Sequence, residues 1–114
     1  MSPSEKKART AAPNDPAWNV TYKRGIGKVI AKLPDVVAAV FDDLVNDLKD
    51  SGPEQTDWLN YGKLKGQKGQ KKNEARYHCH LRRGRPTWVA CWTVWGKEIE
   101  IEIYYVGTHE KAPY

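Results

Sequence analysis

Three runs in the last third of the chain restrict the fold more than any other feature. Residues 98–105 alternate between Glu and Ile before two Tyr, which predicts a strand with Ile facing inward and Glu outward. Residues 87–95 are almost wholly apolar, which predicts a central strand covered on both sides. Residues 76–81 also alternate, so their side chains should point to opposite faces of a sheet. One face of this sheet must be covered by other elements.

Only residues 26–48 offer a helical cover for that face. Apolar residues recur at helical spacing from Ile26 to Leu33, although two nearby glycines weaken this first helix. A second apolar stripe consists of Val37, Val40, Phe41, Leu44, Val45 and Leu48. The run Ser51-Gly52-Pro53 should end it, because Gly can adopt a left-handed conformation and Pro cannot continue a helix. Two consecutive helices of this kind predict an α-hairpin.

These elements predict an α+β fold in the order β-α-α-β-β-β. A first short strand is expected over residues 18–22, and the sheet should be small, twisted and of antiparallel type, with the α-hairpin packed on one face. Residues 54–74 should form a polar connector, with a short helical turn near Thr56 to Tyr61. Residues 17–114 are expected to form one domain, and residues 1–16 a disordered basic arm.

Charge is distributed unevenly along the chain. The net charge of +5 hides a basic segment that contains a single acid, Glu74. Its cations are Lys63, Lys65, Lys68, Lys71, Lys72, Arg76, Arg82, Arg83 and Arg85. The charged side chains of residues 35–57, in contrast, are all acidic apart from Lys49. A focused basic face attracts polyanions, so the basic segment predicts RNA or phosphate binding, although lysines that merely solvate a loop would look the same.

Two cysteines are too few for a disulfide framework. Cys79 and Cys91 fall within strand patterns among apolar neighbours, so we expect free, buried thiols in a reducing compartment. No apolar stretch approaches the roughly 20 residues that a membrane helix needs, and no signal peptide is visible. These observations predict a cytoplasmic protein.

All three histidines lie near the ends of predicted strands. His78 and His80 are two residues apart, so on a strand they share a face, and His109 follows the last strand. Histidine changes charge near neutral pH, which suits general acid–base chemistry. Two other interpretations remain open. The rings could simply face solvent, or His-x-His with a distant His could bind zinc; the basic surroundings and the lack of a fourth ligand favour no metal.

Several of these runs are shared with one known family. They are Lys63–Gly66, Tyr77–Leu81, the turn at Gly96-Lys97-Glu98 and the end of the chain from Tyr104 to Tyr114. With the predicted element order, residues 18–114 resemble the RelE-like toxins of the RelE/ParE toxin–antitoxin superfamily. The histidines and the terminal Tyr are similar to those of its HigB-like members.

The resemblance implies an mRNA endoribonuclease that inhibits translation. Such toxins bind the ribosomal A site and cut mRNA by attack of the ribose 2′-hydroxyl on the adjacent phosphate. A cognate antitoxin is the implied protein partner, and no cofactor or metal is expected. Two alternatives remain: a ParE-type inhibitor of DNA gyrase, or a module that binds RNA or an antitoxin without catalysis.

The family pattern can be transferred residue by residue. His78 and His80 match two family Lys, His109 matches an Arg, and Tyr114 matches a Tyr with a spacing one residue shorter. The Arg of the third strand falls at Val89, which leaves the phosphate to Arg82, Arg83 or Arg85.

The chemistry of 2′-hydroxyl attack assigns roles to these residues. We expect His80 as the base, His109 as the acid and His78 as an orienting or phosphate-binding group. Tyr114 would stack on an RNA base, unless it is a frayed end. Trp88, Trp92 and Trp95 are expected to pack the core rather than to stack on RNA.

Overall fold

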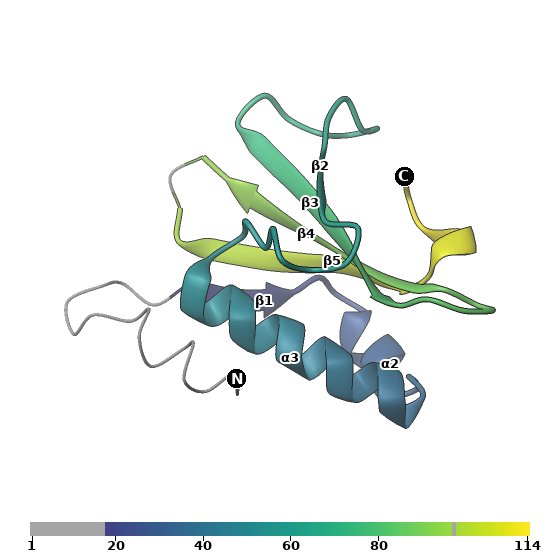
Figure 1. The fold of residues 1–114 in the computed structure, drawn as a ribbon. Helices are drawn as coiled ribbons and strands as arrows, with labels where there is room; N and C mark the ends of the chain where they lie inside the picture. Colours follow the sequence, from purple (N-terminus) through teal and green to yellow (C-terminus); the bar gives the residue numbers. More distant parts are fainter. Residues whose placement is uncertain (1–17, 97) are drawn as a thin grey trace.

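A five-stranded mixed sheet forms the centre of the molecule. The computed structural model describes residues 18–96 and 98–114, and its strands lie in the order β1-β5-β4-β3-β2 (Figure 1). The strands are β1 (Asn19–Tyr22), β2 (Gly62–Leu64), β3 (Glu74–Arg82), β4 (Trp88–Trp95) and β5 (Glu100–Thr108). β1 pairs parallel with β5, and the other neighbours are antiparallel. The apolar strand β4 lies in the middle, as its sequence predicts.

Two helices cover one face of this sheet, which confirms the α+β class and the packed α-hairpin. α2 (Ile26–Ile30) is short, and α3 (Asp35–Ser51) is a 17-residue helix that runs along the sheet (Figure 1). The buried residues of α3 are Val37, Phe41, Leu44, Val45 and Leu48. They form one core cluster with Tyr77, Cys79, Trp92, Ile101 and Ile103 from the sheet. Each fully buried large apolar side chain of this kind contributes roughly 1.5–3 kcal/mol.

Position 52, directly after the end of α3, requires glycine for two reasons. Its φ of 89° lies in the region that favours glycine, and a Cβ there would lie 2.8 Å from Cε2 of Trp18. The Trp18 N–H donates to the carbonyl of Lys49 at 3.3 Å, so the start of the described chain is attached to the end of α3.

The connector between α3 and β3 contains structure that the sequence did not predict. Gly62–Leu64 forms the edge strand β2, whose three residues are too few to show a periodic pattern. The helical turn expected near Thr56 to Tyr61 is wrong. That segment makes two separate turns, in which the N–H groups of Trp58 and Tyr61 donate to the carbonyls of Gln55 and Trp58.

The alternation of β5 is only partly as predicted. Ile101 and Ile103 are fully buried, but Ile99 precedes the strand and is 47% exposed. A bulge then shifts the register, so that Ile103 lies opposite Trp92 but Tyr105 lies opposite Cys91. The bulge changes which residues of β5 face the helices. Val106 therefore joins the core, whereas Tyr105 turns to the opposite side of the sheet.

The cysteines and tryptophans of the sheet are at least half-buried. Cys79 and Cys91 are free and buried, as expected. Among the tryptophans of β4, Trp92 is fully buried, and Trp88 and Trp95 are half-buried.

The basic arm expected over residues 1–16 lies outside the described residues. In the described part of the chain, no helix combines the length and apolarity needed to cross a membrane.

Candidate functional site

The sheet face turned away from α3, which we call the open face, carries polar side chains in register. Along β3, Tyr77, Cys79 and Leu81 point into the core, so Arg76, His78 and His80 lie on the open face. His78 lies between Gly62 on β2 and Cys91 on β4, and His80 lies opposite Val89. The end of the chain, after β5, lies on this same side of the sheet (Figure 1). Strand pairing thus places both histidines beside the C-terminal segment.

His78, His80, His109 and Tyr114 come together there and form what we call the histidine cluster. The ring of Tyr114 lies on His78 with centroids 4.5 Å apart and an interplanar angle of 35°. His80 and His109 meet edge to face at 5.4 Å, and His109 and Tyr114 at 5.8 Å. Residues 29 and 36 positions apart in the sequence, His80 with His109 and His78 with Tyr114, therefore lie next to each other.

Backbone contacts after β5 bring His109 and Tyr114 to this place. The Tyr105 hydroxyl donates to the carbonyl of Thr108 at 2.6 Å, and the His109 N–H donates to the carbonyl of Thr87 at 2.8 Å. His109–Lys111 then forms one 3-10 turn (η1), which reverses the chain. Gly107 is needed beside it, because a Cβ there would lie 2.7 Å from the Tyr105 hydroxyl oxygen.

The neighbouring loop before β3 fixes the two strand histidines. The His80 N–H donates to the carbonyl of Leu59 at 2.7 Å. A Cβ on Gly62 would lie 2.8 Å from Nε2 of His78, so only glycine leaves room for this ring position. Sequence reasoning missed Leu59 and Gly62. Neither carries a reactive group, and only the pairing of β2 with β3 reveals their role.

Burial favours the neutral form of both strand histidines. It lowers the pKa of His78, and the nearby His80 and His109 lower it further. It also lowers the pKa of His80, with additional effects from His109 and Arg83. The Nδ1 atoms of both rings are buried without a hydrogen-bond partner among the described residues. No acceptor among the described residues is available at Nδ1 to stabilise a charged ring, so the geometry agrees with the pKa directions.

Tyr114 differs from the histidines in its proton chemistry. Burial raises the pKa of its hydroxyl to about 12, and the thiol groups of Cys91 and Cys79 add to the effect. The hydroxyl therefore keeps its proton at neutral pH and can donate a hydrogen bond. The side chain also remains 38% exposed, so part of the ring is open to a stacking partner.

The cation expected near the reacting phosphate has one well-placed candidate. Val89 is fully buried beneath the open face and offers no charge. Arg83 acts electrostatically on His80, and its Nη2 donates to the side-chain oxygen of Asn60 at 3.3 Å. Arg82, the last residue of β3, and Arg85, in the β3–β4 turn, are both exposed, and Arg85 lines a cavity of about 580 Å³ together with His109.

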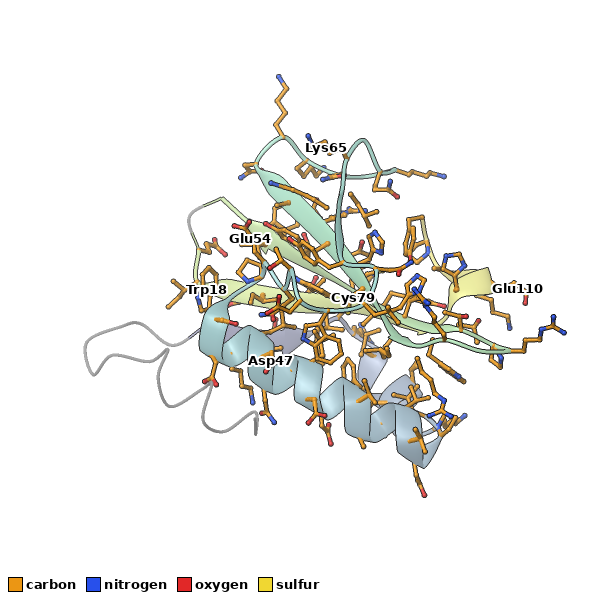
Figure 2. The ribbon with its side chains drawn as sticks, in the orientation of Figure 1. Trp18, Asp47, Glu54, Lys65, Cys79 and Glu110 are labelled. Atoms are coloured by element: carbon orange, nitrogen blue, oxygen red, sulfur yellow. The ribbon has the colours of Figure 1, made fainter. Side chains whose placement is uncertain are left out.

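The other predicted phosphate-binding residues do not form one continuous patch around the histidines. Lys63 pairs with Tyr77, and its Nζ lies 5.8 Å from that ring, so it points to the face opposite His78. Lys65, Lys71 and Lys72 line a cavity of about 440 Å³ in the loop between β2 and β3. Figure 2 shows Lys65 in this loop, far from α3.

That basic loop has a defined conformation. The side-chain amide of Gln70 donates to the carbonyls of Leu64 and Glu74 at 3.2 and 3.1 Å, and its oxygen accepts from the Gln67 N–H at 3.0 Å. One glutamine thus links both ends of the loop, which holds its lysines at one edge of the sheet.

A metal centre has no support in the described residues. No group of three or more His, Cys, Asp or Glu side chains within them has an arrangement that could hold a metal ion.

A solved structure shares the fold of this chain, although comparison of the sequence with known proteins finds no match. No model of a known protein family matches the sequence, and no curated protein matches it. One chain in the crystal structure of the archaeal RelE–RelB complex from Pyrococcus horikoshii OT3 superimposes with a TM-score of 0.64. The match covers 85% of this chain and all of that chain, at 18% identity.

The fold is RelE-like. The arrangement predicted from the sequence, an α-hairpin on one face of a small sheet, is therefore an arrangement that a solved RelE–RelB structure also contains. At 18% identity, this similarity shows that the two backbones fold alike. It does not show that the two proteins share a functional site.

Proposed function

We propose that this protein is the toxin of a toxin–antitoxin pair and cleaves mRNA on the ribosome. The observation that carries the proposal is the histidine cluster: two neutral imidazoles, a third histidine and a stacking Tyr meet on the open face of a RelE-like fold. RNA cleavage through the 2′-hydroxyl requires a base, an acid and a cation near the phosphate, and each has a candidate here.

Proton transfer begins at His80. Its buried Nδ1 carries the ring proton, so the unprotonated Nε2 is the atom that takes the proton of the ribose 2′-hydroxyl. The 2′-oxygen attacks the adjacent phosphorus, a new P–O bond forms and the bond to the 5′-oxygen breaks. His109 gives a proton to that leaving oxygen. The products are a 2′,3′-cyclic phosphate and a 5′-hydroxyl.

The remaining groups bind and orient the RNA. Arg83 beside His80 stabilises the charge on the pentacovalent phosphate. Tyr114 stacks on a base and donates a hydrogen bond from its protonated hydroxyl. The basic loop of residues 63–72 attracts ribosomal RNA through its phosphates without reading sequence. An antitoxin, by analogy with the RelE–RelB complex, binds the toxin and blocks this face.

Primer extension on mRNA tests the proposal directly. Cells expressing wild-type protein should stop growing and show discrete cuts that follow the reading frame, and the cuts should vanish with His109→Ala. Lys111→Gln, an exposed change in the same 3-10 turn, is the matched control and should cleave like wild type. Full cleavage by a His80→Ala, His109→Ala double variant would show that the catalytic assignment is wrong.

A non-catalytic RNA-binding module is the second candidate. The buried Val89 favours it, because the third-strand position offers no cation to the phosphate. Such a module would bind ribosomes with a steep salt dependence but leave mRNA intact. Binding without cuts in the wild-type protein would favour this second function.

A further inference from the structure

Another cavity lies on the open face beside the histidine cluster. It has a volume of about 370 Å³, and its lining includes Lys23, Lys68, Arg76, Trp95, Glu102 and Tyr104. Arg76 precedes His78 by two residues on β3, so the two positions share a face and are about 6.6 Å apart along the strand. Pro113, next to Tyr114, also lines the cavity. This cavity, which we call the Arg76 cavity, therefore adjoins the histidine cluster.

The floor of the Arg76 cavity is a hydrogen-bonded network. Arg76 Nε donates to Oε2 of Glu74 at 2.6 Å, and the Thr93 hydroxyl donates to the same oxygen at 2.7 Å. Burial would raise the pKa of Glu74, but hydrogen bonds from Arg76, Thr93 and the Lys71 N–H outweigh it and lower the pKa. The carboxylate is therefore ionised and fully engaged. The guanidinium of Arg76 also lies over the Tyr104 ring, 5.3 Å from its centroid.

This network changes the role of Arg76. Its nitrogen atoms are directed to Glu74 and, at 3.3 Å, to the carbonyl of Lys68. Arg76 therefore holds the cavity in shape and positions Tyr104, rather than serving as a phosphate-binding cation. The groups that remain for a ligand are those of the walls.

The walls combine three kinds of group. Trp95 and Tyr104 provide aromatic surface, and Lys23 and Lys68 are exposed cations. The carboxylate of Glu102 has no hydrogen bond or ion pair with any residue that the structure describes, although it is only half-exposed. Because Glu74 and Arg76 neutralise each other, two lysines and the single carboxylate of Glu102 remain, so neither a simple anion nor a metal ion would satisfy every group. An apolar ligand would leave Glu102 without a partner.

A nucleotide satisfies all of these groups together. Aromatic side chains stack on bases, lysines bind phosphates, and a carboxylate accepts a hydrogen bond from an exocyclic amino group. Uracil has no amino group: where cytosine carries it, uracil has the carbonyl oxygen O4, which cannot donate to Glu102, and its one ring N–H on that edge, at N3, lies at a different position. Cytosine and adenine would each donate to it.

We propose that the Arg76 cavity binds the nucleotide next to the cleaved bond and prefers a base with an amino group. The inference deepens the proposed function, because it names a specificity site for the same RNA. Glu102 reads the base, Tyr104 and Trp95 support its ring, and Lys23 and Lys68 hold its phosphates.

Binding of non-cleavable RNA tests the subsite independently of catalysis. The probes are short oligonucleotides with a 2′-deoxy sugar at the cleaved position, identical except for cytosine or uracil at the flanking nucleotide. Wild-type protein should bind the cytosine form about ten- to a hundredfold more tightly, a typical effect of one hydrogen bond to a charged group. Glu102→Gln should bring this ratio close to one, because an amide no longer favours a donor over an acceptor.

Two further variants make the result specific. Glu100→Gln changes a carboxylate on the same strand that does not line the cavity, so it should keep the wild-type ratio. His80→Ala should also keep it, because His80 is outside the cavity. Equal binding of both oligonucleotides by the wild type, or an unchanged ratio in Glu102→Gln, would overturn the subsite. Cleavage that survives in the histidine variants would overturn the proposed function and leave this ratio unaffected.

Discussion

The two faces of β3 show how differently one strand can be used. On the helix side, Tyr77, Cys79 and Leu81 are almost fully buried among apolar neighbours. On the open side, the strand carries ring nitrogens that are buried yet have no hydrogen-bond partner among the described residues. The first face satisfies its side chains by packing. The second face leaves the Nδ1 atoms of His78 and His80 without hydrogen-bond partners among the described residues, as is typical of a ligand-binding or catalytic surface.

Removal of the proposed base should give the largest effect on cleavage. It should also show most clearly that the open face affects cleavage and not stability. His80→Asn should lower cleavage by about 10²- to 10⁴-fold, the usual contribution of a general base. The free energy of unfolding should change little, because the core does not include this ring. Single-turnover cleavage of mRNA on ribosomes and urea denaturation measure the two quantities. A large loss of stability with normal cleavage would contradict the distinction between the faces.

The helix side should respond in the opposite way. Leu44 is fully buried in α3, so Leu44→Ala should lower the free energy of unfolding by about 2–5 kcal/mol through lost burial and a cavity. Cleavage per folded molecule should persist. Val36→Ala is the matched control on the same helix, because Val36 is 53% exposed, and it should change stability little. Urea denaturation of both variants measures the difference.

Gly62 tests the link between backbone and site. In Gly62→Ala the new Cβ would meet Nε2 of His78 at 2.8 Å, so the ring must move. The clash should cost about 1–3 kcal/mol, in stability or in activity. In a His78→Ala background the same change should have almost no effect, which a double-mutant cycle measures. Equal costs in both backgrounds would show that His78 is not the group that Gly62 accommodates.

The pH dependence of stability should show the smallest effect. The pKa values of His78 and His80 are lowered below 6.5 in the folded protein, so the folded state binds fewer protons than the unfolded state. Their contribution to stability is present above pH 6.5 and is lost as the pH falls through the folded pKa values. Urea denaturation between pH 5 and 8 should therefore show a steeper decline for the wild type than for a His78→Asn, His80→Asn variant. Parallel curves would indicate that burial of these rings carries no proton linkage.

Much of the fold was predictable because it depends on local periodicity. The apolar stripe of α3, the central position of β4 and the two faces of β3 all follow from repeats of 3.6 or two residues. The strand β2 was not predictable, because three residues with a Lys and a Gly show no period. The bulge in β5 was also hidden, since it depends on the register with β4.

For the candidate site, the sequence by itself determined which residues could take part: three histidines, a terminal Tyr and the basic segment. Only the tertiary structure decided their positions relative to one another. In the folded protein, His109 and Tyr114 lie against the histidines of β3. Lys63 lies on the opposite face, and Arg76 forms an ion pair with Glu74. The physical reason is that residue type fixes which chemistry a side chain can perform. Proximity and protonation depend instead on long-range strand pairing and burial, which no local pattern records.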